Sequence, residues 1–362
     1  VDASIPTLNT ILDPLYVSSN TQLPVTWNAQ DTHSGIKEYK IRLVTNNVTL
    51  LPVSENTVIL PRVFSATTLN YIFDSGTDKS FLKDGQKYYT TIAGKNDAGL
   101  WTTFNTLISD GVTVDASAPT MNLVWDTVYV TSNTSYKVNW SAFDEHTRIK
   151  AYQFDIVSAD KTTVVSSNYW DKTDFTPHYN NTSFNYTFTY PFNDGEQFYA
   201  KVKALNSADI WSEYMMSDGV TIDASIPTIN SIEDGIYVTS NTHIKFIWDI
   251  EDSHSGVNTI NIKISSENAT YQKFEANIVS QNTLSSPDFD TIFSSTVSST
   301  NFVGNTGYLE DGKKYYALME ITNQAGLTQN IMSDGVTVDA SAPNITIVDD
   351  GDYVVSMFDF PV

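Results

Sequence analysis

The sequence predicts an all-β protein, a tandem array of β-sandwiches joined by short rigid junctions. Two observations predict this fold: apolar and polar residues alternate with period two along the chain, and one junction sequence recurs. The junction reads SDGVTVDASAP at 109–119, SDGVTIDASIP at 217–227 and SDGVTVDASAP at 333–343, and the chain opens on VDASIP. Copies about 110 residues apart are spaced like domains rather than like the turns of a solenoid.

The junctions divide the chain of 362 residues into three repeats and a remainder. We place repeat 1 at 1–113, repeat 2 at 114–221 and repeat 3 at 222–337. A unit of this size can bury an adequate core without disulfides, and the chain has no cysteine. Only four residues separate Val114 from Pro119. Proline restricts the backbone and no Gly/Ser linker is present, so we expect a stiff rod.

Composition narrows the classes of partner. The net charge is −22, from 42 acidic and 20 basic residues, so nucleic acid and anionic membranes should repel the chain. No apolar stretch approaches the ~20 residues of a membrane span. No signal peptide is visible, and the chain starts on Val1 inside a junction, which we interpret as a mature or excerpted piece of a longer protein.

The alternation marks individual strands. After an acidic turn in each repeat, apolar side chains occupy every second position, which places them on one face of a half-buried strand. These positions are Tyr39, Ile41 and Leu43; Tyr152, Phe154 and Ile156; and Ile260, Ile262 and Ile264. No convincing 3.6-residue period is found. A tryptophan precedes the acidic turn in every repeat, and we expect these indoles in three separate cores: Trp27, Trp140 and Trp248.

A second strand follows a glycine turn, as in Leu82-Lys-Asp-Gly-Gln-Lys-Tyr88. The order Pro, Trp and then Leu-x-x-Gly-x-x-Tyr-x-x-x-Val-x-Ala-x-Asn resembles the fibronectin type III module, and bacterial Ig-like surface repeats are close relatives. The resemblance implies a seven-stranded sandwich with the tryptophan in its core and a tyrosine corner at Tyr88 and Tyr315. Phe198 replaces the corner tyrosine in repeat 2, and each repeat is longer than the usual module, with the excess near 46–80, 158–183 and 265–305.

Two sets of side chains suggest metal binding. A histidine recurs in the acidic turn of each repeat, as His33, His146 and His254. Each is alone in its repeat, whereas a zinc site requires three or four ligands, so we interpret these histidines as turn structure. Calcium takes six to eight oxygens, and acidic junctions could supply them, although the same residues suit turns and caps. The calcium candidates are Asp110, Asp115, Asp144, Asp218, Asp223, Asp252, Asp334 and Asp339.

Sequons and aromatic residues offer other sites. Seven asparagines are candidates for N-glycosylation: Asn47, Asn133, Asn139, Asn181, Asn185, Asn268 and Asn344. Asn180 overlaps Asn181 and would share its glycan. Aromatic residues in the second insert either form a sugar-binding face or pack inside an enlarged sandwich; they are Tyr169, Trp170, Phe175 and Tyr179.

These observations predict a structural extracellular repeat protein that forms a fibre, stalk or surface-layer rod. No catalytic motif is present, so we expect no enzymatic activity. The expected partners are N-glycans and further copies of the chain, joined head to tail. Residues 338–362 repeat a first strand, and we expect apolar residues such as Val355, Met357, Phe358 and Phe360 to complete a fourth domain or to add to another copy by β-augmentation. The alternative is an adhesin or glycan-binding protein, with the repeats as spacers and the inserts as the binding surface.

Overall fold

The computed structural model describes residues 1–45, 62–74, 82–171, 173–176, 182–285, 296–303 and 309–347. The chain forms two compact units. Unit 1 comprises Val1–Val128, Ser135–Tyr190 and Gln197–Val220, and unit 2 comprises Tyr129–Thr134, Pro191–Glu196 and Thr221–Val362. The boundaries of the three repeats given above stay a prediction. The apolar residues predicted for the end of the chain, among them Val355 and Phe358, lie outside the described residues.

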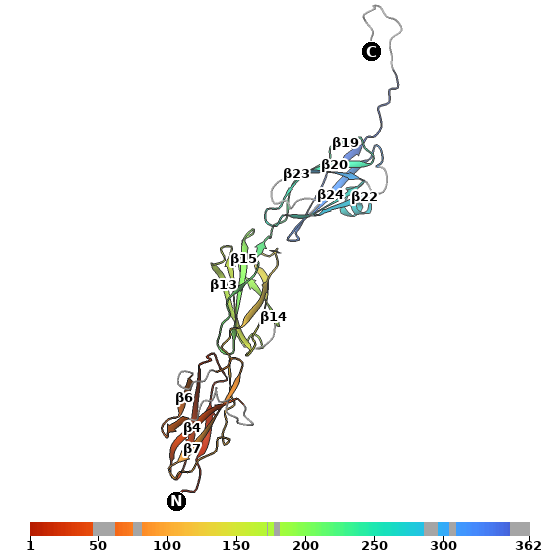
Figure 1. Ribbon diagram of the computed structural model, residues 1–362. Helices are drawn as coiled ribbons and strands as arrows, with labels where there is room; N and C mark the ends of the chain where they lie inside the picture. The colour runs from red at the N-terminus through yellow and green to blue at the C-terminus, as the bar shows by residue number, and fades with distance from the viewer. Residues whose placement is uncertain are drawn as a thin grey trace, which may run out of the picture. The chain divides into compact units, whose positions relative to one another are not determined.

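The first repeat consists of two sheets (Figure 1). The smaller sheet has the order β1 (Thr7–Leu12), β3 (Gln22–Gln30) and β6 (Asn70–Asp74). The larger has the order β2 (Tyr16–Val17), β8 (Val112–Val114), β7 (Lys87–Asn96), β4 (Ile36–Val44) and β5 (Arg62–Ser65). All of these pairs are antiparallel except β2 with β8.

The same strand pattern recurs twice. In unit 1, the smaller sheet has the order β14 (Thr182–Thr189), β11 (Ser135–Phe143) and β9 (Thr120–Trp125). The larger sheet includes, in order of pairing, β13 (Val164–Trp170), β12 (Ile149–Ser158), β15 (Gln197–Asn206) and β16 (Met215–Met216). In unit 2, β10 (Tyr129–Val130) lies parallel to the end of β17 (Val220–Ile222).

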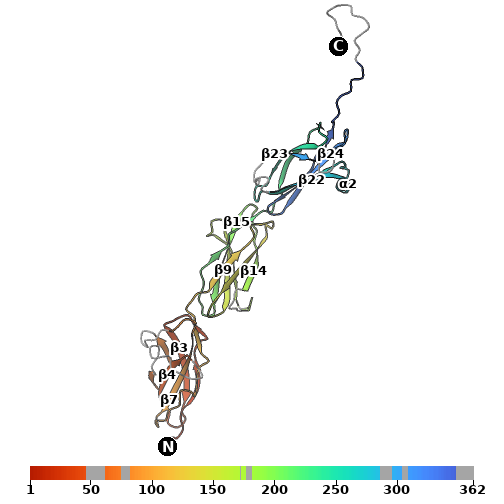
Figure 2. The same cartoon turned by 45° about the vertical axis from the view of Figure 1, so that its right-hand side comes forward.

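The third repeat lies in unit 2. Its smaller sheet has the order β18 (Thr228–Glu233), β20 (His243–Glu251) and β23 (Thr296–Val303). Its larger sheet has the order β19 (Tyr237–Val238), β26 (Val336–Val338), β24 (Lys314–Asn323), β21 (Val257–Ser265) and β22 (Ile278–Ser285), with β25 (Thr328–Met332) also paired to β24. A short helix, α2 (Tyr271–Ala276), lies beside β22 (Figure 2). Sequence analysis did not predict this helix, because six residues are too few to display a helical period.

The cores lie between the sheets, because alternate side chains of each strand point to the same face. In β4, Tyr39, Ile41 and Leu43 are buried, as the alternation requires. The three tryptophans have exposed fractions of 4, 0 and 3% for Trp27, Trp140 and Trp248. Each repeat therefore builds its own core around one indole.

Candidate functional site at the repeat junctions

The segment that follows the last strand of a repeat is fixed by a buried asparagine. Asn206, at the end of β15, donates its side-chain amide to Asp115 Oδ2 at 2.9 Å, to the carbonyl of Ser117 at 3.0 Å and to Asp144 Oδ2 at 3.1 Å. Asn206 and Asp115 are fully buried, and Asp144 is 3% exposed. We call this arrangement of one asparagine between two aspartates the Asp–Asn clamp.

The clamp recurs in the other repeats. In repeat 3, Asn323 donates to Asp223 Oδ2 at 2.9 Å, to the carbonyl of Ser225 at 3.1 Å and to Asp252 Oδ2 at 3.0 Å. In repeat 1, the side-chain amide of Asn96 makes the matching hydrogen bonds with Asp2, the Ser4 carbonyl and Asp31. The same three groups therefore meet wherever an Asp-Ala-Ser segment enters a repeat.

The clamp satisfies the charges that it buries. In repeat 2, Asp144 Oδ1 accepts the backbone N–H of Thr147 at 2.7 Å, and the Thr147 hydroxyl donates to Asp115 Oδ2 at 2.6 Å. Burial raises the pKa of the Asp115 carboxyl, and the hydrogen bond from Thr147 opposes that rise. A buried carboxylate persists only where donors replace water. The arrangement thus ties the junction segment, the acidic turn and the end of a strand together.

Beside the clamp, a histidine of the acidic turn contacts the aspartate of an Asp–Gly turn from earlier in the chain. In unit 1, His146 Nε2 lies 3.6 Å from Asp84 Oδ2, and Asp84 Oδ1 accepts the backbone N–H of Ala116 at 2.8 Å. The next residue, Gly85, has φ +75, and a Cβ there would lie 2.6 Å from the imidazole ring. Glycine is required both for this left-handed backbone and for the approach of the ring.

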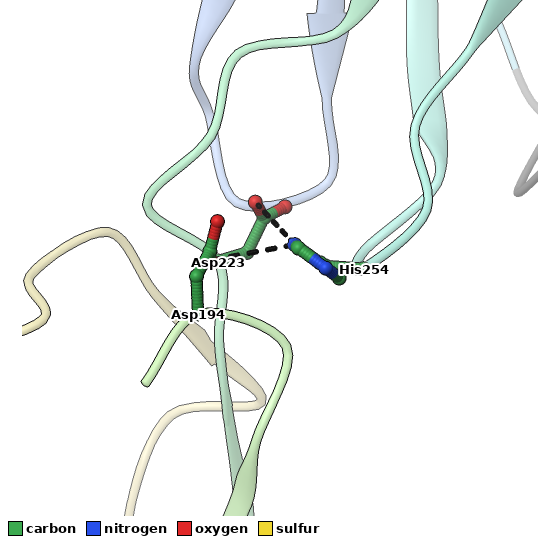
Figure 3. Close-up of side chains that lie close together, drawn as sticks. All are labelled: Asp194, Asp223 and His254. Atoms are coloured by element: carbon green, nitrogen blue, oxygen red, sulfur yellow. Dashed lines mark ion pairs between the residues drawn. The ribbon is translucent and has the colours of Figure 1, made fainter. Parts of the chain in front are cut away.

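Unit 2 contains the same contact. His254 Nδ1 lies 3.3 Å from Asp194 Oδ1 and 3.9 Å from Asp223 Oδ1 (Figure 3). Asp194 Oδ1 also accepts the backbone N–H of Ala224 at 2.7 Å, and a Cβ on Gly195 would lie 2.7 Å from the imidazole. The two histidines therefore do more than shape their own turns. Each contacts a carboxylate from the turn that precedes a strand, β7 for His146 and β15 for His254.

The Asp194, Asp223 and His254 side chains also have the spacing of a metal site. One ligand atom from each lies within 4.8 Å of the others, and they are the one such group of three in the described part of the chain. Sequence reasoning missed Asp84 and Asp194, although the Leu-x-Asp-Gly type of turn in which they lie was visible. It judged each histidine against its own repeat alone.

The predicted calcium ligands fall into separate groups. Asp115 and Asp144 meet in one clamp and Asp223 and Asp252 in another, each pair bridged by an asparagine amide. The exposed carboxylates of the Ser-Asp-Gly segments lie elsewhere, beside a different aspartate of each repeat: Asp110 beside Asp13, Asp218 beside Asp126 and Asp334 beside Asp234. Asp339 is exposed. Calcium binding by these residues stays a prediction.

The tyrosine-corner positions are buried. The hydroxyl of Tyr88 accepts the backbone N–H of Lys83 at 3.0 Å, and that of Tyr315 accepts the backbone N–H of Glu310 at 2.9 Å. Phe198 is 3% exposed and has no hydroxyl with which to accept such a bond.

Most described sequons lie on the surface. Asn133, Asn185, Asn268 and Asn344 are exposed. Asn139 is half-buried and donates its amide to the carbonyl of Trp125 at 3.5 Å. Asn47 and Asn181 lie outside the described residues.

The aromatic residues of the second insert divide between core and surface. Trp170 packs against Trp140 with ring centroids 5.5 Å apart, and Phe175 packs against Tyr152 at 5.3 Å. Tyr169 is 53% exposed and contacts another ring outside the core. Tyr179 lies outside the described residues.

The chain was compared with known proteins. No protein-family model matches the sequence, and a search of characterised proteins returns no match. Similar solved structures include the chicken CNTN1 FN1-FN3 domains, with 16% identity and a TM-score of 0.31 over 91% of this chain and 99% of that one. The Clostridium thermocellum CbhA fibronectin(III)-like modules show 12% identity and a TM-score of 0.31 over 60% of this chain and 94% of that one. A 1.5-MDa bacterial ice-binding adhesin shows 14% identity and a TM-score of 0.37 over 93% of this chain and 98% of that one.

The strand pattern defines the class of protein. Each repeat has two facing sheets, a buried tryptophan and a short parallel edge pair, so the chain is a tandem array of fibronectin III-like or Ig-like β-sandwiches. Within the described residues, no helix is long and apolar enough to cross a membrane.

Proposed function

We propose that this chain is a structural, non-enzymatic component of an extracellular fibre, stalk or surface layer, in which its junctions hold successive repeats in a fixed relation. The Asp–Asn clamp and the Asp–His contact support this role. A flexible spacer needs neither, because a Gly/Ser linker would suffice. Here a buried network is built at each junction instead.

Each end of the repeat array supports head-to-tail assembly. The His33 side chain is 64% exposed, against 21% for His146 and 28% for His254, which face Asp–Gly turns. At the Asp311–Gly312 turn, a Cβ on Gly312 would meet nothing within 4 Å. The face around His33 and the turn at Gly312 are thus the two uncovered halves of a contact that is made internally twice. The partner that fits them is another repeat of the same type, and head-to-tail assembly is the proposed source of that repeat.

Cysteine cross-linking tests this assembly, because the chain has no cysteine of its own. The double variant His33→Cys with Asp311→Cys should give a ladder of covalent multimers with a short bifunctional thiol reagent. The matched control is His146→Cys with Asp84→Cys, which should cross-link within one chain. Monomer alone from the first variant, with efficient reaction of the control, would refute the head-to-tail contact.

N-glycosylation is the second part of the proposal. Four described sequons are exposed, and attached sugars would suit an extracellular surface: Asn133, Asn185, Asn268 and Asn344. Mass spectrometry of peptides from the native protein should find hexose-containing adducts on them. Unmodified peptides at all four positions would remove the glycan from the proposal.

One observation favours the alternative, a glycan-binding surface. Tyr169 and Tyr214 are 53% and 38% exposed, and Trp211 and Lys203 lie between them, with the Lys203 ammonium 4.5 Å from the indole centroid. Exposed aromatic faces stack on sugar rings. If Tyr169→Ala and wild type show the same glycan binding on an array, the glycan-binding alternative is ruled out and the structural role remains.

A further inference from the structure

A carboxylate in the third repeat is buried without a hydrogen-bond partner. Asp234 follows the last residue of β18 and is only 7% exposed. Both of its carboxylate oxygens are covered, and neither accepts a hydrogen bond within the described structure. An unpaired buried carboxylate costs several kcal/mol unless it is protonated or meets a cation. The fold therefore leaves a charge here that something outside the chain should balance.

A second carboxylate stands beside it. Asp334 follows Ser333 directly after β25, and it is exposed. Burial is the main cause that raises the pKa of Asp234, a contact with the Ser333 hydroxyl lowers it, and repulsion from Asp334 raises it again. The Ser333 oxygen accepts the backbone N–H of Ala317 at 3.0 Å, and its single hydroxyl proton can serve at most one of the two Asp234 oxygens. No described lysine, arginine or histidine forms an ion pair with Asp234 or Asp334.

These two aspartates line a pocket of about 480 Å³. Glu233, Asp234, Gly235, Ser333 and Asp334 form its polar wall. The space is ample for an ion with several water molecules, since one water occupies ~30 Å³ in the liquid.

The pair occurs in every repeat. Asp13 follows β1 and Asp126 follows β9, and all four of their carboxylate oxygens are buried without a hydrogen-bond partner. Burial raises the pKa of both, to about 6 for Asp126, and in each case a serine and an aspartate of a Ser-Asp-Gly segment are the neighbours. A defect of one side chain would not recur three times at the same place.

We propose that Asp234 and Asp334 bind a hard divalent cation of the calcium class, and that the pairs Asp13–Asp110 and Asp126–Asp218 form the equivalent sites of the other repeats. Two carboxylates neutralise the charge of one such ion and supply up to four of its six to eight oxygen ligands. Water in the pocket completes the shell. The donor set has no nitrogen or sulfur, which disfavours zinc and copper. Asp234 was absent from the predicted ligands because nothing in the sequence shows that its strand end faces the Ser-Asp-Gly segment.

The site rests on the carboxylate pairs alone and is independent of the proposed assembly. With two protein carboxylates and a shell completed by water, the affinity should be that of weak extracellular calcium sites, with Kd about 10⁻⁴–10⁻³ M. The ion would join the end of β18 to the end of β25, and so link the two sheets of one repeat.

Calorimetric titration of the whole chain with CaCl₂, after treatment with EGTA at pH 7.5, tests the proposal. Wild type should bind about three ions, one per repeat. Asp334→Asn changes an exposed side chain and should remove about one site while the circular dichroism spectrum stays unchanged. Asp234→Asn should do the same. Asp339→Asn removes the same charge from an exposed position outside the pocket and should keep the full stoichiometry.

Terbium luminescence gives a second readout that does not depend on heat. Tb³⁺ sensitised by the aromatic residues should be displaced by millimolar Ca²⁺, and the signal should fall by about a third in Asp334→Asn. Absence of calcium binding at 10 mM would overturn the proposal. So would an unchanged stoichiometry in both pocket variants, or an equal loss in Asp339→Asn.

Discussion

Changing Asn206 to aspartate should destabilise repeat 2 severely. The substitution keeps the shape of the side chain but replaces the amide nitrogen by oxygen, so three hydrogen bonds are lost. Two of them go to carboxylates, and each such bond contributes about 1.5–3 kcal/mol. A third carboxylate would then lie about 3 Å from Asp115 and Asp144, both almost fully buried. We expect a loss of about 3–5 kcal/mol, the range found when a buried ionic group loses its partner.

The loss should depend on pH with a defined sign. Crowding raises the pKa of the introduced carboxyl and of Asp115 in the folded variant above the value of ~3.9 in the unfolded chain. The folded variant then binds more protons than the unfolded chain in mildly acidic solution. Its stability therefore rises as the pH falls toward 4, and the deficit relative to wild type is largest at neutral pH.

Hydrogen exchange followed by mass spectrometry locates the effect. A loss of about 4 kcal/mol should speed exchange of β12 and β15 peptides by about a thousandfold at pH 7. Peptides of β24, where Asn323 makes an intact clamp, serve as the internal reference. Asn185→Asp adds the same charge at an exposed site of repeat 2 and should change little. Equal exchange in Asn206→Asp and Asn185→Asp would refute the view that the clamp stabilises the repeat.

Three further substitutions probe separate contacts. Gly195→Ala strains a φ of +80 and places a Cβ against the His254 ring, so it should lower the Tm more than Gly312→Ala. At Gly312 the φ of +79 gives the same strain, but the space around a Cβ is free. Equal shifts in Tm would contradict the packing argument. Tyr315→Phe should cost about 1 kcal/mol in urea unfolding, because a backbone N–H loses its acceptor. Trp248→Ala should cost about 3–5 kcal/mol, and a cost under 1 kcal/mol would show that the indole is not central to its core.

Periodicity and repetition predicted the architecture because both reflect local chemistry. Alternation in 39–43 shows which face of the strand is buried, and the structure buries the same side chains of β4. The repeated junction separated a tandem array from one large sandwich. The pattern does not show which strands are neighbours. The parallel pairing of β2 with β8 therefore came from the structure alone.

The junction contacts escaped sequence reasoning for a related reason. Asp115, Asp144 and Asn206 lie 29 and 62 residues apart along the chain, and only the folded sandwich brings them together. Aspartates in turns have ordinary local roles, so nothing marks them as partners of a distant amide. The contact of His146 was missed because its partner, Asp84, belongs to a different repeat.

The three repeats differ in their cores far more than at their junctions, and this contrast has a physical cause. Core positions exchange freely: the second residue of the strand after the glycine turn is Tyr88 in one copy and Phe198 in the next. Apolar packing tolerates such exchanges when volume is kept. The Asp-Ala-Ser segment and the clamp asparagine do not vary, because an amide between two buried carboxylates has no substitute that donates in both directions. The restriction therefore lies where buried charge must be satisfied, and the same hydrogen bonds hold each junction segment against the repeat that it enters, as the proposed fibre or stalk requires.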